Sequence, residues 1–373
     1  VPVGGGVVVL LLCVTLFMKL VSYAHVHRDL RLAAREIATS REIAARSTSR
    51  DLDGAHLDGL AKPTDRQILS VCLSKPPSDP GHLAPPASRA AGVPPLPPPP
   101  LRRRDSDVVQ DTDANVRRYP ESVSLRGLLY FVLAPTLCYQ EYFPRTSRVR
   151  PAYLASLVGR LLLLSAFNIF ICQQYIMPLL SNSVSALDAL DLPRLGERLL
   201  NLALPCTYVW LAGFYAFFHV WLNVLAELLR FGDRVFYLEW WNTTSFEHYW
   251  RLWNIPVHSW IARHIYFPFL RAAASRGLRR APAKQLAGAL CFFCSAVFHE
   301  LIIGLPLRGV RVPLAFFAMM AQVPLISASG YLPRTEGTPF AALGNYVFWL
   351  SFCFIGQPLA VLLYFYQAQP PQC

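Results

Sequence analysis

Long apolar runs, separated by polar and basic segments, constrain the fold of this chain more than any other feature. Each approaches the roughly 20 residues that a helix needs to cross a bilayer; the runs are residues 3–23, 154–177, 199–229, 285–307, 312–331 and 343–366. Inside a bilayer only helices and closed barrels satisfy their own backbone polar groups, and runs of this length suit helices. The composition agrees, because 54% of the residues are hydrophobic and 16% are charged, whereas a soluble domain carries about 25% charged residues. The sequence therefore predicts an all-α, polytopic transmembrane helical bundle and disfavours a soluble enzyme, a coiled coil, a collagen or a wholly disordered chain.

The net charge of +12 lies in the loops between the apolar runs. In a soluble protein it would indicate nucleic acid, but cytoplasmic loops that follow the positive-inside rule explain it better here. We therefore expect no nucleic-acid partner. The chain also has nine cysteines, and the pair Cys291 and Cys294 lies inside an apolar run without a second pair at metal-site spacing. We interpret this pair as packing and expect no metal, because zinc would need more ligands.

Three regions are predicted along the chain. Residues 1–23 form the first transmembrane helix, with Lys19 near its end and able to extend its charge to the interface. Residues 24–118 contain no aromatic residue and include a long proline-rich stretch that arginines follow. Such a segment cannot bury enough apolar surface to offset its chain entropy, so we expect a disordered Pro/Arg-rich insert, in which residues 28–50 have a helical pattern that can extend the first span. Residues 119–373 form the folded core.

Two aromatic segments of the core are too short or too polar to cross the bilayer. Residues 128–139 are broken by Pro135, and residues 236–260 hold five of the eight tryptophans. Tryptophan and tyrosine concentrate at membrane interfaces. We therefore expect interfacial amphipathic helices in both segments, arranged as a helix pair in the second; a re-entrant segment is the alternative for the first.

A polar stripe lies inside one apolar run. His219, Asn223 and Glu227 recur every four residues, which places them on one helix face. Polar groups at this depth are costly unless they face protein or a wet cavity. We expect this face to point into the bundle.

His299 stands in another apolar run and is followed by Glu300. An ionisable pair at this depth is a functional candidate, and a buried neutral imidazole suits a general base. Ser295 lies one turn earlier and shares the His299 face, whereas Glu300 points about 100° away and is expected to bond a neighbouring helix. A structural histidine bonded to another helix is the alternative.

Amide side chains form a second set of polar candidates. Asn254 precedes Pro256 at a helix start, which is typical of a cap, and His258 follows one turn later; an amide aimed at a reacting carbonyl is the alternative for Asn254. Gln322 and Gln357 lie in the last two apolar runs, next to prolines. They can tie helices together, or they can line a polar reaction chamber.

One stretch of the core is free of acidic residues. No Asp or Glu occurs between Glu247 and Glu300, whereas the basic residues there include Arg263, Arg279, Arg280 and Lys284. A cytoplasmic loop that follows the positive-inside rule explains this pattern. A binding surface for a polyanionic ligand is compatible with the same orientation.

The segment FYLEWWN, residues 236–242, resembles the FYxDWWN signature of membrane-bound O-acyltransferases that use acyl-CoA, in the branch that contains diacylglycerol and sterol acyltransferases. The matching positions are Phe236, Tyr237, Glu239, Trp240, Trp241 and Asn242. Glu239 stands where the signature has aspartate, a shorter acid of the same charge. His299, before Glu300, resembles the catalytic histidine of that family.

Further stretches between Tyr119 and Tyr366 resemble the type 1 diacylglycerol acyltransferases of that branch, in the same order. They include LAPTLCY at 133–139, WNIPVH at 253–258, MMAQVP at 319–324 and IGQP at 355–358. The sterol enzymes share the signature and the histidine but usually lack the WNIPVH and IGQP forms, so the diacylglycerol branch is preferred. The family has further transmembrane helices before the first span seen here, so we expect the N-terminal part of the family fold to be missing.

The resemblance implies an acyl-CoA-dependent O-acyltransferase that esterifies diacylglycerol to triacylglycerol in a chamber within the membrane, without a cofactor and without a covalent acyl-enzyme. The implied partners are acyl-CoA, diacylglycerol and membrane lipid. The full-length protein would form a dimer or a tetramer and cross the endoplasmic reticulum membrane several times. A sterol or long-chain-alcohol acyltransferase, and a non-catalytic polytopic membrane protein, are the alternatives.

The resemblance assigns the role of catalytic base to His299, and we add the other roles from the polar candidates. The expected catalytic residues are His299, with Asn254, Gln357 and Glu300. The expected substrate contacts are His258, Gln322, Ser295 and Trp253, and the phosphates of acyl-CoA would meet Arg263, Arg279, Arg280 and Lys284.

Overall fold

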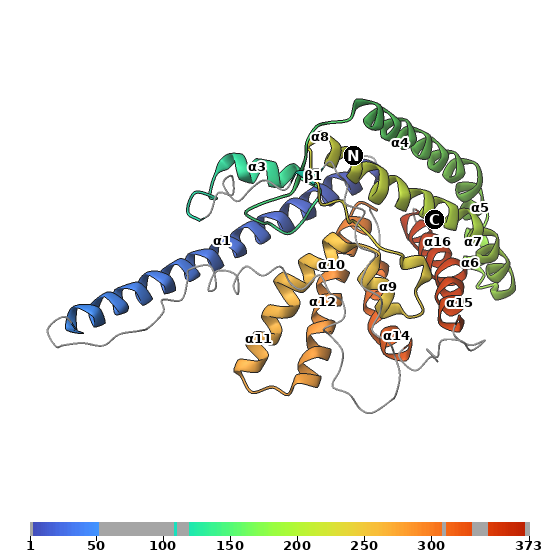
Figure 1. The fold of residues 1–373 in the computed structure, drawn as a ribbon. Helices are drawn as coiled ribbons and strands as arrows, with labels where there is room; N and C mark the ends of the chain where they lie inside the picture. Colours follow the sequence, from blue (N-terminus) through green and yellow to red (C-terminus); the bar gives the residue numbers. More distant parts are fainter. Residues whose placement is uncertain (1–2, 52–107, 110–118, 308–310, 330–341, 370–373) are drawn as a thin grey trace.

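The computed structural model describes residues 3–51, 108–109, 119–307, 311–329 and 342–369. In these residues the fold is helical (Figure 1), apart from an antiparallel pairing between β1 (Val108–Val109) and β2 (Arg145–Thr146). The described helical stretches that are long and apolar enough to cross a bilayer are Gly4–Ile43, Pro151–Asp188, Leu192–Leu228, Arg280–Ile303 and Leu343–Ala368. The prediction of an all-α, polytopic membrane protein is confirmed.

The first helix is longer than the first apolar run. α1 extends from Val3 to Asp51, so residues 24–51 are helical rather than part of a disordered insert, as the pattern of residues 28–50 indicated. Of the remaining insert the structure describes only β1, and the prediction of disorder for residues 52–107 and 110–118 lies outside the described residues.

Lys19 is buried against protein instead of extending its charge into water, contrary to the prediction. Its residue is 4% exposed, and its Nζ donates to the carbonyl oxygens of Phe131 (2.8 Å) and Ala134 (2.6 Å) at the end of α3 (Leu125–Leu133). The ammonium also lies 5.0 Å from the centre of the Phe131 ring. The last carbonyls of a helix lack intrahelical partners and carry partial negative charge, so they take the place of water around the buried cation.

α1 also packs on a continuous helix whose parts are α10 (Ile255–Ile261), η6 (Ala262–Tyr266) and α11 (Phe267–Ser275). Trp260 Nε1 donates to the Met18 carbonyl over 2.7 Å. His264 Nε2 lies 2.9 Å from Ser22 Oγ, and its Nδ1 lies 3.1 Å from His25 Nδ1. One of these two Nδ1 atoms must donate and the other accept, so the contact requires a neutral imidazole.

Three π turns precede prolines that lie inside continuous helices. η3 (Cys172–Ile176) joins α4 (Pro151–Ile171) to α5 (Met177–Ser181) before Pro178; η6 precedes Pro268; η7 (Ser351–Gly356) joins α15 (Leu343–Leu350) to α16 (Gln357–Ala368) before Pro358. Proline has no N–H, and its ring collides with the carbonyl four residues earlier. A wider turn relieves the collision and lets the helix continue.

A fourth π turn, η4 (Tyr215–Trp221), joins α7 (Leu192–Phe214) to α8 (Leu222–Leu228). Here Asn223 Nδ2 donates to the His219 carbonyl over 2.7 Å, and such an inserted side chain also opens a helix. Asn223 and Glu227 are 8% and 0% exposed, and His219 Nδ1 lies 2.9 Å from Tyr237 Oη. The prediction that this polar stripe faces protein is confirmed.

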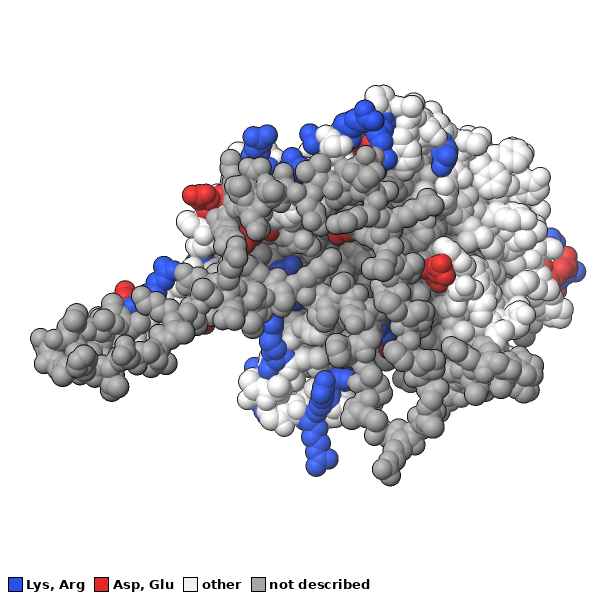
Figure 2. All heavy atoms as spheres, viewed as in Figure 1, with Lys and Arg blue, Asp and Glu red and all other residues white. Residues whose placement is uncertain are grey.

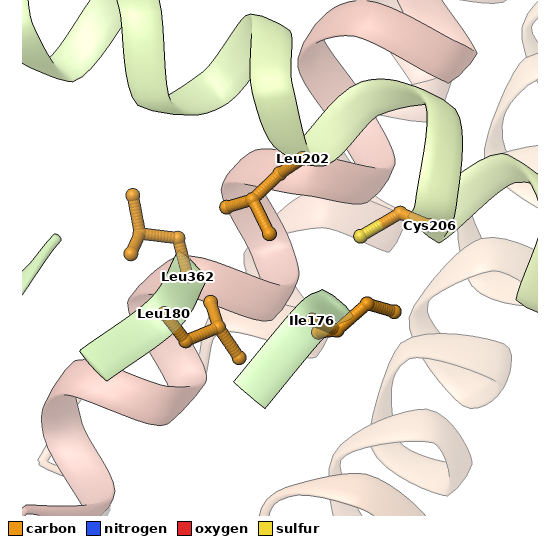
Figure 3. Packing of buried hydrophobic residues seen from close by; sticks show 5 residues of the cluster. All are labelled: Ile176, Leu180, Leu202, Cys206 and Leu362. Carbon is orange, nitrogen blue, oxygen red and sulfur yellow. The ribbon is translucent and has the colours of Figure 1, made fainter. Parts of the chain in front are cut away.

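Two hydrophobic clusters hold the C-terminal half of the bundle together. In the first, shown in Figure 3, the buried members come from η3, α5, α7 and α16 and are Ile176, Leu180, Leu202, Cys206 and Leu362. The second is aromatic, and its buried members are Phe214, Phe218, Trp240, Tyr249 and Phe348. Together they fasten α7 to the last span.

The segment at residues 236–260 contains two consecutive helices, as predicted, but also extended chain and buried tryptophans. It contains an extended strip, the short η5 (Trp240–Asn242), α9 (Phe246–Leu252) and the start of α10. Trp240 and Trp260 are 2% and 3% exposed. The Trp240 ring packs on other aromatic rings, and such pairs are favourable beyond their buried area. The Trp260 ring packs on His264, Met18 and Leu137, so both tryptophans are core residues.

Two further short helices precede α8 in the chain, α3 and α6 (Val184–Asp188). α3 ends before Pro135, as predicted, and presents Leu125, Leu129 and Leu133 on one exposed face.

After α11 the chain turns and forms α12 (Arg280–Ile303) (Figure 1). The helices α13 (Leu314–Met320) and α14 (Gln322–Ser329) pack beside α12.

The packing of α1 on His264 predicts a pH dependence of stability. Burial, then the nearby Arg263 guanidinium and His25, lower the pKa of His264 from 6.5 to about 3. Below pH 6.5 the unfolded chain binds the proton that the folded protein refuses, so the free energy of unfolding falls as the pH drops towards 3. If the whole pKa difference between the folded and the unfolded chain contributes, the free energy of unfolding is lower by about 2 kcal/mol at pH 5 than at neutral pH.

The measurement is the melting temperature of the detergent-solubilised full-length protein at pH 7.5 and at pH 5. We expect the drop on acidification to be smaller in His264→Gln, which keeps a polar side chain but cannot titrate. An unchanged drop in this variant would contradict the assignment to His264.

Candidate active site

His299 lies near the C-terminal end of α12 in a defined tautomer. Its Nδ1 lies 2.8 Å from the Ser295 carbonyl oxygen, one turn earlier, and 3.4 Å from Ser295 Oγ. A carbonyl oxygen only accepts, so Nδ1 carries the proton and Nε2 keeps its lone pair. No residue in the described part of the chain hydrogen-bonds to this Nε2. The ring is therefore oriented with Nε2 ready to accept a proton.

The His299 face of α12 continues towards α9 and α14. Phe292 lies seven residues before His299, on the same face, and its ring centre is 5.6 Å from that of Trp250 in α9. Trp250 Nε1 donates to Gln322 Oε1 over 3.3 Å. The structure thus connects Gln322 to this side of α12 through Trp250, which the sequence had not singled out; its place in the dense tryptophan segment was the only signal.

Glu300 points to other helices, as predicted. Its Oε2 accepts from the Phe316 backbone N–H (3.1 Å) in α13 and from Tyr364 Oη (3.0 Å) in α16. Tyr364 Oη also accepts from the Ala315 N–H over 2.6 Å. In this structure Glu300 fastens α12 to its two neighbours, and its predicted catalytic role stays a prediction.

Asn254 caps α10, as the first of the two predictions for this residue held. Its Oδ1 accepts from the Val257 N–H over 3.2 Å. Its neighbour Trp253 stacks on Trp210 at 5.8 Å between ring centres, and His258 exposes its side chain on α10. The amide nitrogen of Asn254 remains available as a donor, because the cap uses only the oxygen.

Gln357 begins α16 directly after the π turn η7 and is half-buried. Gln322, by contrast, has both ends of its amide engaged, since its Nε2 donates to the Ala318 carbonyl over 3.2 Å. Gln322 therefore ties α14 to α9 through Trp250, as one of the two interpretations held. Within the described residues no hydrogen bond joins Asn254 or Gln357 to His299.

The FYLEWWN segment is pinned by its backbone. The Phe236 carbonyl accepts from the Ile255 N–H (2.9 Å), and the Leu238 N–H donates to the Leu252 carbonyl (2.8 Å). Phe236 and Trp240 are buried, Tyr237 meets His219, and the side chains of Glu239, Trp241 and Asn242 are exposed. An exposed Glu239 is consistent with either acid at this position.

Residues of α15 hold the end of this segment, and sequence inspection had missed them. Asn345 Nδ2 donates to the carbonyls of Trp241 (2.9 Å) and Thr243 (2.7 Å), and Trp349 Nε1 donates to the Trp241 carbonyl (3.1 Å). A Cβ added to Gly344 would collide with the Thr244 backbone. The last span therefore positions the segment by close backbone contact, a pairing that no local motif reveals.

The basic candidates fall into two groups. Arg263 donates to the Tyr139 carbonyl over 3.2 Å, so it supports the loop after α3. Arg279 and Arg280 are exposed at the start of α12, with Lys284 one turn further. Figure 2 shows blue basic side chains near the α11–α12 turn that Figure 1 places at the lower edge.

The cysteines of α12 are free thiols. Cys291 and Cys294 are both half-buried and unpaired with each other. Across the described residues no group of three or more His, Cys, Asp or Glu side chains is arranged to hold a metal ion.

Comparison with known proteins defines the class. The model of the membrane-bound O-acyltransferase family (MBOAT) matches residues 11–366, which is nearly the whole chain. The chain belongs to the membrane-bound O-acyltransferase family, as the FYLEWWN segment and His299 indicated.

Curated relatives carry a more specific name. The chain is 48% identical over 244 residues to diacylglycerol O-acyltransferase 1 of Arabidopsis thaliana, covering 65% of this chain and 44% of the relative. It is 46% identical over 248 residues to that of Corylus americana (66% and 44%) and 41% identical over 258 residues to that of Dictyostelium discoideum (69% and 39%). The chain thus spans less than half the length of these relatives.

The close approach of α15 to the FYLEWWN segment predicts an effect of Gly344→Ala. The added methyl group forces α15 away from the Thr244 backbone, and overpacking of this kind costs about 1–3 kcal/mol. We expect a melting temperature several degrees lower, measured on the full-length protein in detergent.

The matched control is Gly159→Ala in α4, where an added Cβ meets nothing within 4 Å. A helical alanine there is neutral or stabilising by up to about 1 kcal/mol. Equal melting temperatures for the two variants would mean that α15 does not press on Thr244.

Proposed function

We propose that this chain carries the catalytic part of an acyl-CoA-dependent O-acyltransferase that esterifies diacylglycerol to triacylglycerol. Membership of the family and the names of the relatives support this assignment. The single observation that carries the chemistry is the His299 tautomer, with Nδ1–H bonded to the Ser295 carbonyl and Nε2 open.

His299 acts as general base on the acceptor hydroxyl. Nε2 takes the hydroxyl proton as the oxygen attacks the thioester carbonyl, the carbon–sulfur bond breaks, and the imidazolium returns the proton to the leaving thiolate of CoA. Positive charge on the ring is stabilised by the Ser295 carbonyl, in the way that a second group orients and supports a base. No acyl-enzyme and no cofactor enter this scheme.

The oxyanion that develops on the thioester carbon needs donors in a dry site. Asn254 is our first choice, because its cap uses Oδ1 and leaves Nδ2; Gln357 is the second, half-buried at the start of α16. Glu300 supports the catalytic turn by holding α12 to α13 and α16. Ser295, Trp253, His258 and Gln322 are proposed as further contacts to the substrates.

In this proposal the phosphates of acyl-CoA bind at the start of α12. Arg279, Arg280 and Lys284 lie there without an acidic residue nearby in sequence, and guanidinium groups suit phosphate oxygens. Lys284 lies fifteen residues before His299 on one helix, about 22 Å along its axis and about 60° around it. An extended CoA arm has to follow α12 over this distance; Arg263 assists from η6.

The proposal includes a setting for the full-length protein. The spans make the chain a multi-pass membrane protein, and we place it in the endoplasmic reticulum with the start of α12 in the cytoplasm. Diacylglycerol enters from the bilayer, the full-length protein is a homo-oligomer of two or four copies, and nucleic acid is not a partner.

The base assignment predicts the effect of His299→Ala in the full-length protein. Loss of a general base lowers turnover by about 10²–10⁴-fold, while the melting temperature changes little. The measurement is incorporation of labelled acyl-CoA into triacylglycerol in membranes. Cys294→Ala on the same helix is the control and is expected to keep its activity; wild-type turnover in His299→Ala would refute the assignment.

The acceptor is tested by competition. The same membranes receive labelled acyl-CoA with diacylglycerol and cholesterol in parallel, and we expect label in triacylglycerol. Label in sterol ester instead would identify a sterol acyltransferase, and no ester with either acceptor, despite a folded protein, would favour a non-catalytic bundle.

A further inference from the structure

A second concentration of arginines lies outside the site described above, at the ends of two spans. Residues 144–150 and 227–234 contain the arginines Arg145, Arg148, Arg150, Arg230 and Arg234, against two acids, Glu227 and Asp233; we call them the five-arginine cluster. One membrane-spanning stretch begins at Pro151 and another ends at Leu228. The cluster therefore lies next to the boundary between the bilayer and water.

The two segments are joined into one rigid unit. The Gly232 N–H donates to the Pro144 carbonyl (2.8 Å), and the Thr146 N–H donates to the Arg230 carbonyl (2.8 Å). Arg230 Nε returns a bond to the Thr146 carbonyl over 2.8 Å. Gly232 permits this close approach, because a Cβ there would lie 3.0 Å from the Pro144 oxygen.

A single carboxylate, that of Glu227, pairs with two guanidinium groups. Its carboxylate is 0% exposed and accepts from Arg150 NH2 at 2.9 Å and Arg234 NH1 at 2.7 Å, both on Oε2. Arg150 also donates through its backbone N–H and Nε to Oε1. Within the described residues the two guanidinium groups share one buried carboxylate, which fixes their orientation before any ligand arrives.

One donor of this unit lacks an acceptor. The NH2 group of Arg234 is buried and has no hydrogen-bond partner among the described residues. A buried polar group without a partner costs about 1–3 kcal/mol and more when it is charged, so the site would be stabilised by an acceptor oxygen. A shallow hollow of about 250 Å³ is lined by residues 148–152, which include Arg148 and Arg150. Arg150 shares the Glu227 carboxylate with Arg234.

We propose that the five-arginine cluster binds the phosphate of an anionic glycerophospholipid from the surrounding bilayer. Basic groups at the end of a membrane span attract anionic lipid headgroups, and a guanidinium pair matches phosphate oxygens. The membrane supplies this ligand at the level where Pro151 and Leu228 place the arginines. Figure 1 shows the start of α4 and the α11–α12 turn at different edges of the molecule, and in Figure 2 basic side chains gather at both places; CoA is therefore tested as the competing source of phosphate.

The test titrates the purified full-length protein in a neutral detergent with water-soluble dioctanoyl phosphatidylserine. Dioctanoyl phosphatidylcholine, which has a phosphate but no net charge, is the lipid control, and CoA is the competitor. Arg148→Gln removes an exposed charge from the hollow without touching Glu227. Arg276→Gln at the α11–α12 turn removes the same charge from the other basic region.

We expect phosphatidylserine to bind more tightly than phosphatidylcholine and not to be displaced by CoA. Arg148→Gln should weaken its binding about fivefold, the factor that about 1 kcal/mol per basic residue represents, and Arg276→Gln should not change it. Arg234→Lys keeps a cation for Glu227 but loses the unpartnered NH2, and it should weaken binding as well. Equal effects of Arg148→Gln and Arg276→Gln, displacement by CoA, or equal binding of the two lipids would each overturn the proposal.

Discussion

A buried charge inside this bundle needs partners from the protein, because the hydrocarbon of the bilayer offers none. The structure meets this constraint in a few repeated ways. Lys19 donates to the free carbonyls at the end of α3, and Glu227 pairs with two arginines. Glu300 accepts from a backbone N–H and from a tyrosine hydroxyl. The contacts of Lys19 with α3, of Glu227 with Arg150 and of Glu300 with Tyr364 join elements that are distant in sequence. The satisfaction of buried charge therefore also determines which helices lie together.

The same constraint shapes the helices themselves. A proline within a span would leave a carbonyl without its N–H partner and collide with the preceding turn. Here π turns before Pro178, Pro268 and Pro358 let the helices continue. Asn223 opens a further π turn by bonding to the His219 carbonyl. Such widened turns place side chains away from the regular helical positions, which is one reason why functional sites often contain them.

The candidate active site depends on contacts of different range. The orientation of His299 is local, because the Ser295 carbonyl lies one turn away on the same helix. The aromatic side of the site is not local: Phe292 meets Trp250, and Trp250 meets Gln322. The FYLEWWN segment is held by α9, α10 and α15. A base that is oriented by its own helix can therefore be combined with a chamber whose walls come from several helices.

The sequence by itself determined the membrane class, five of the six predicted spans, the family, and the burial of the stripe with Glu227, because these follow from hydropathy, local spacing and a contiguous motif. The sixth predicted span, residues 312–331, contains instead the shorter helices α13 and α14. The sequence also indicated that Glu300 would face another helix, since consecutive residues diverge by about 100°. Tertiary structure alone decided that Lys19 turns inward, that Trp240 and Trp260 are core residues rather than interface anchors, and that Asn345 and Trp349 hold the FYLEWWN segment. These outcomes depend on partners that lie about a hundred or more residues away, and no periodicity within one helix specifies which carbonyl or ring it will meet.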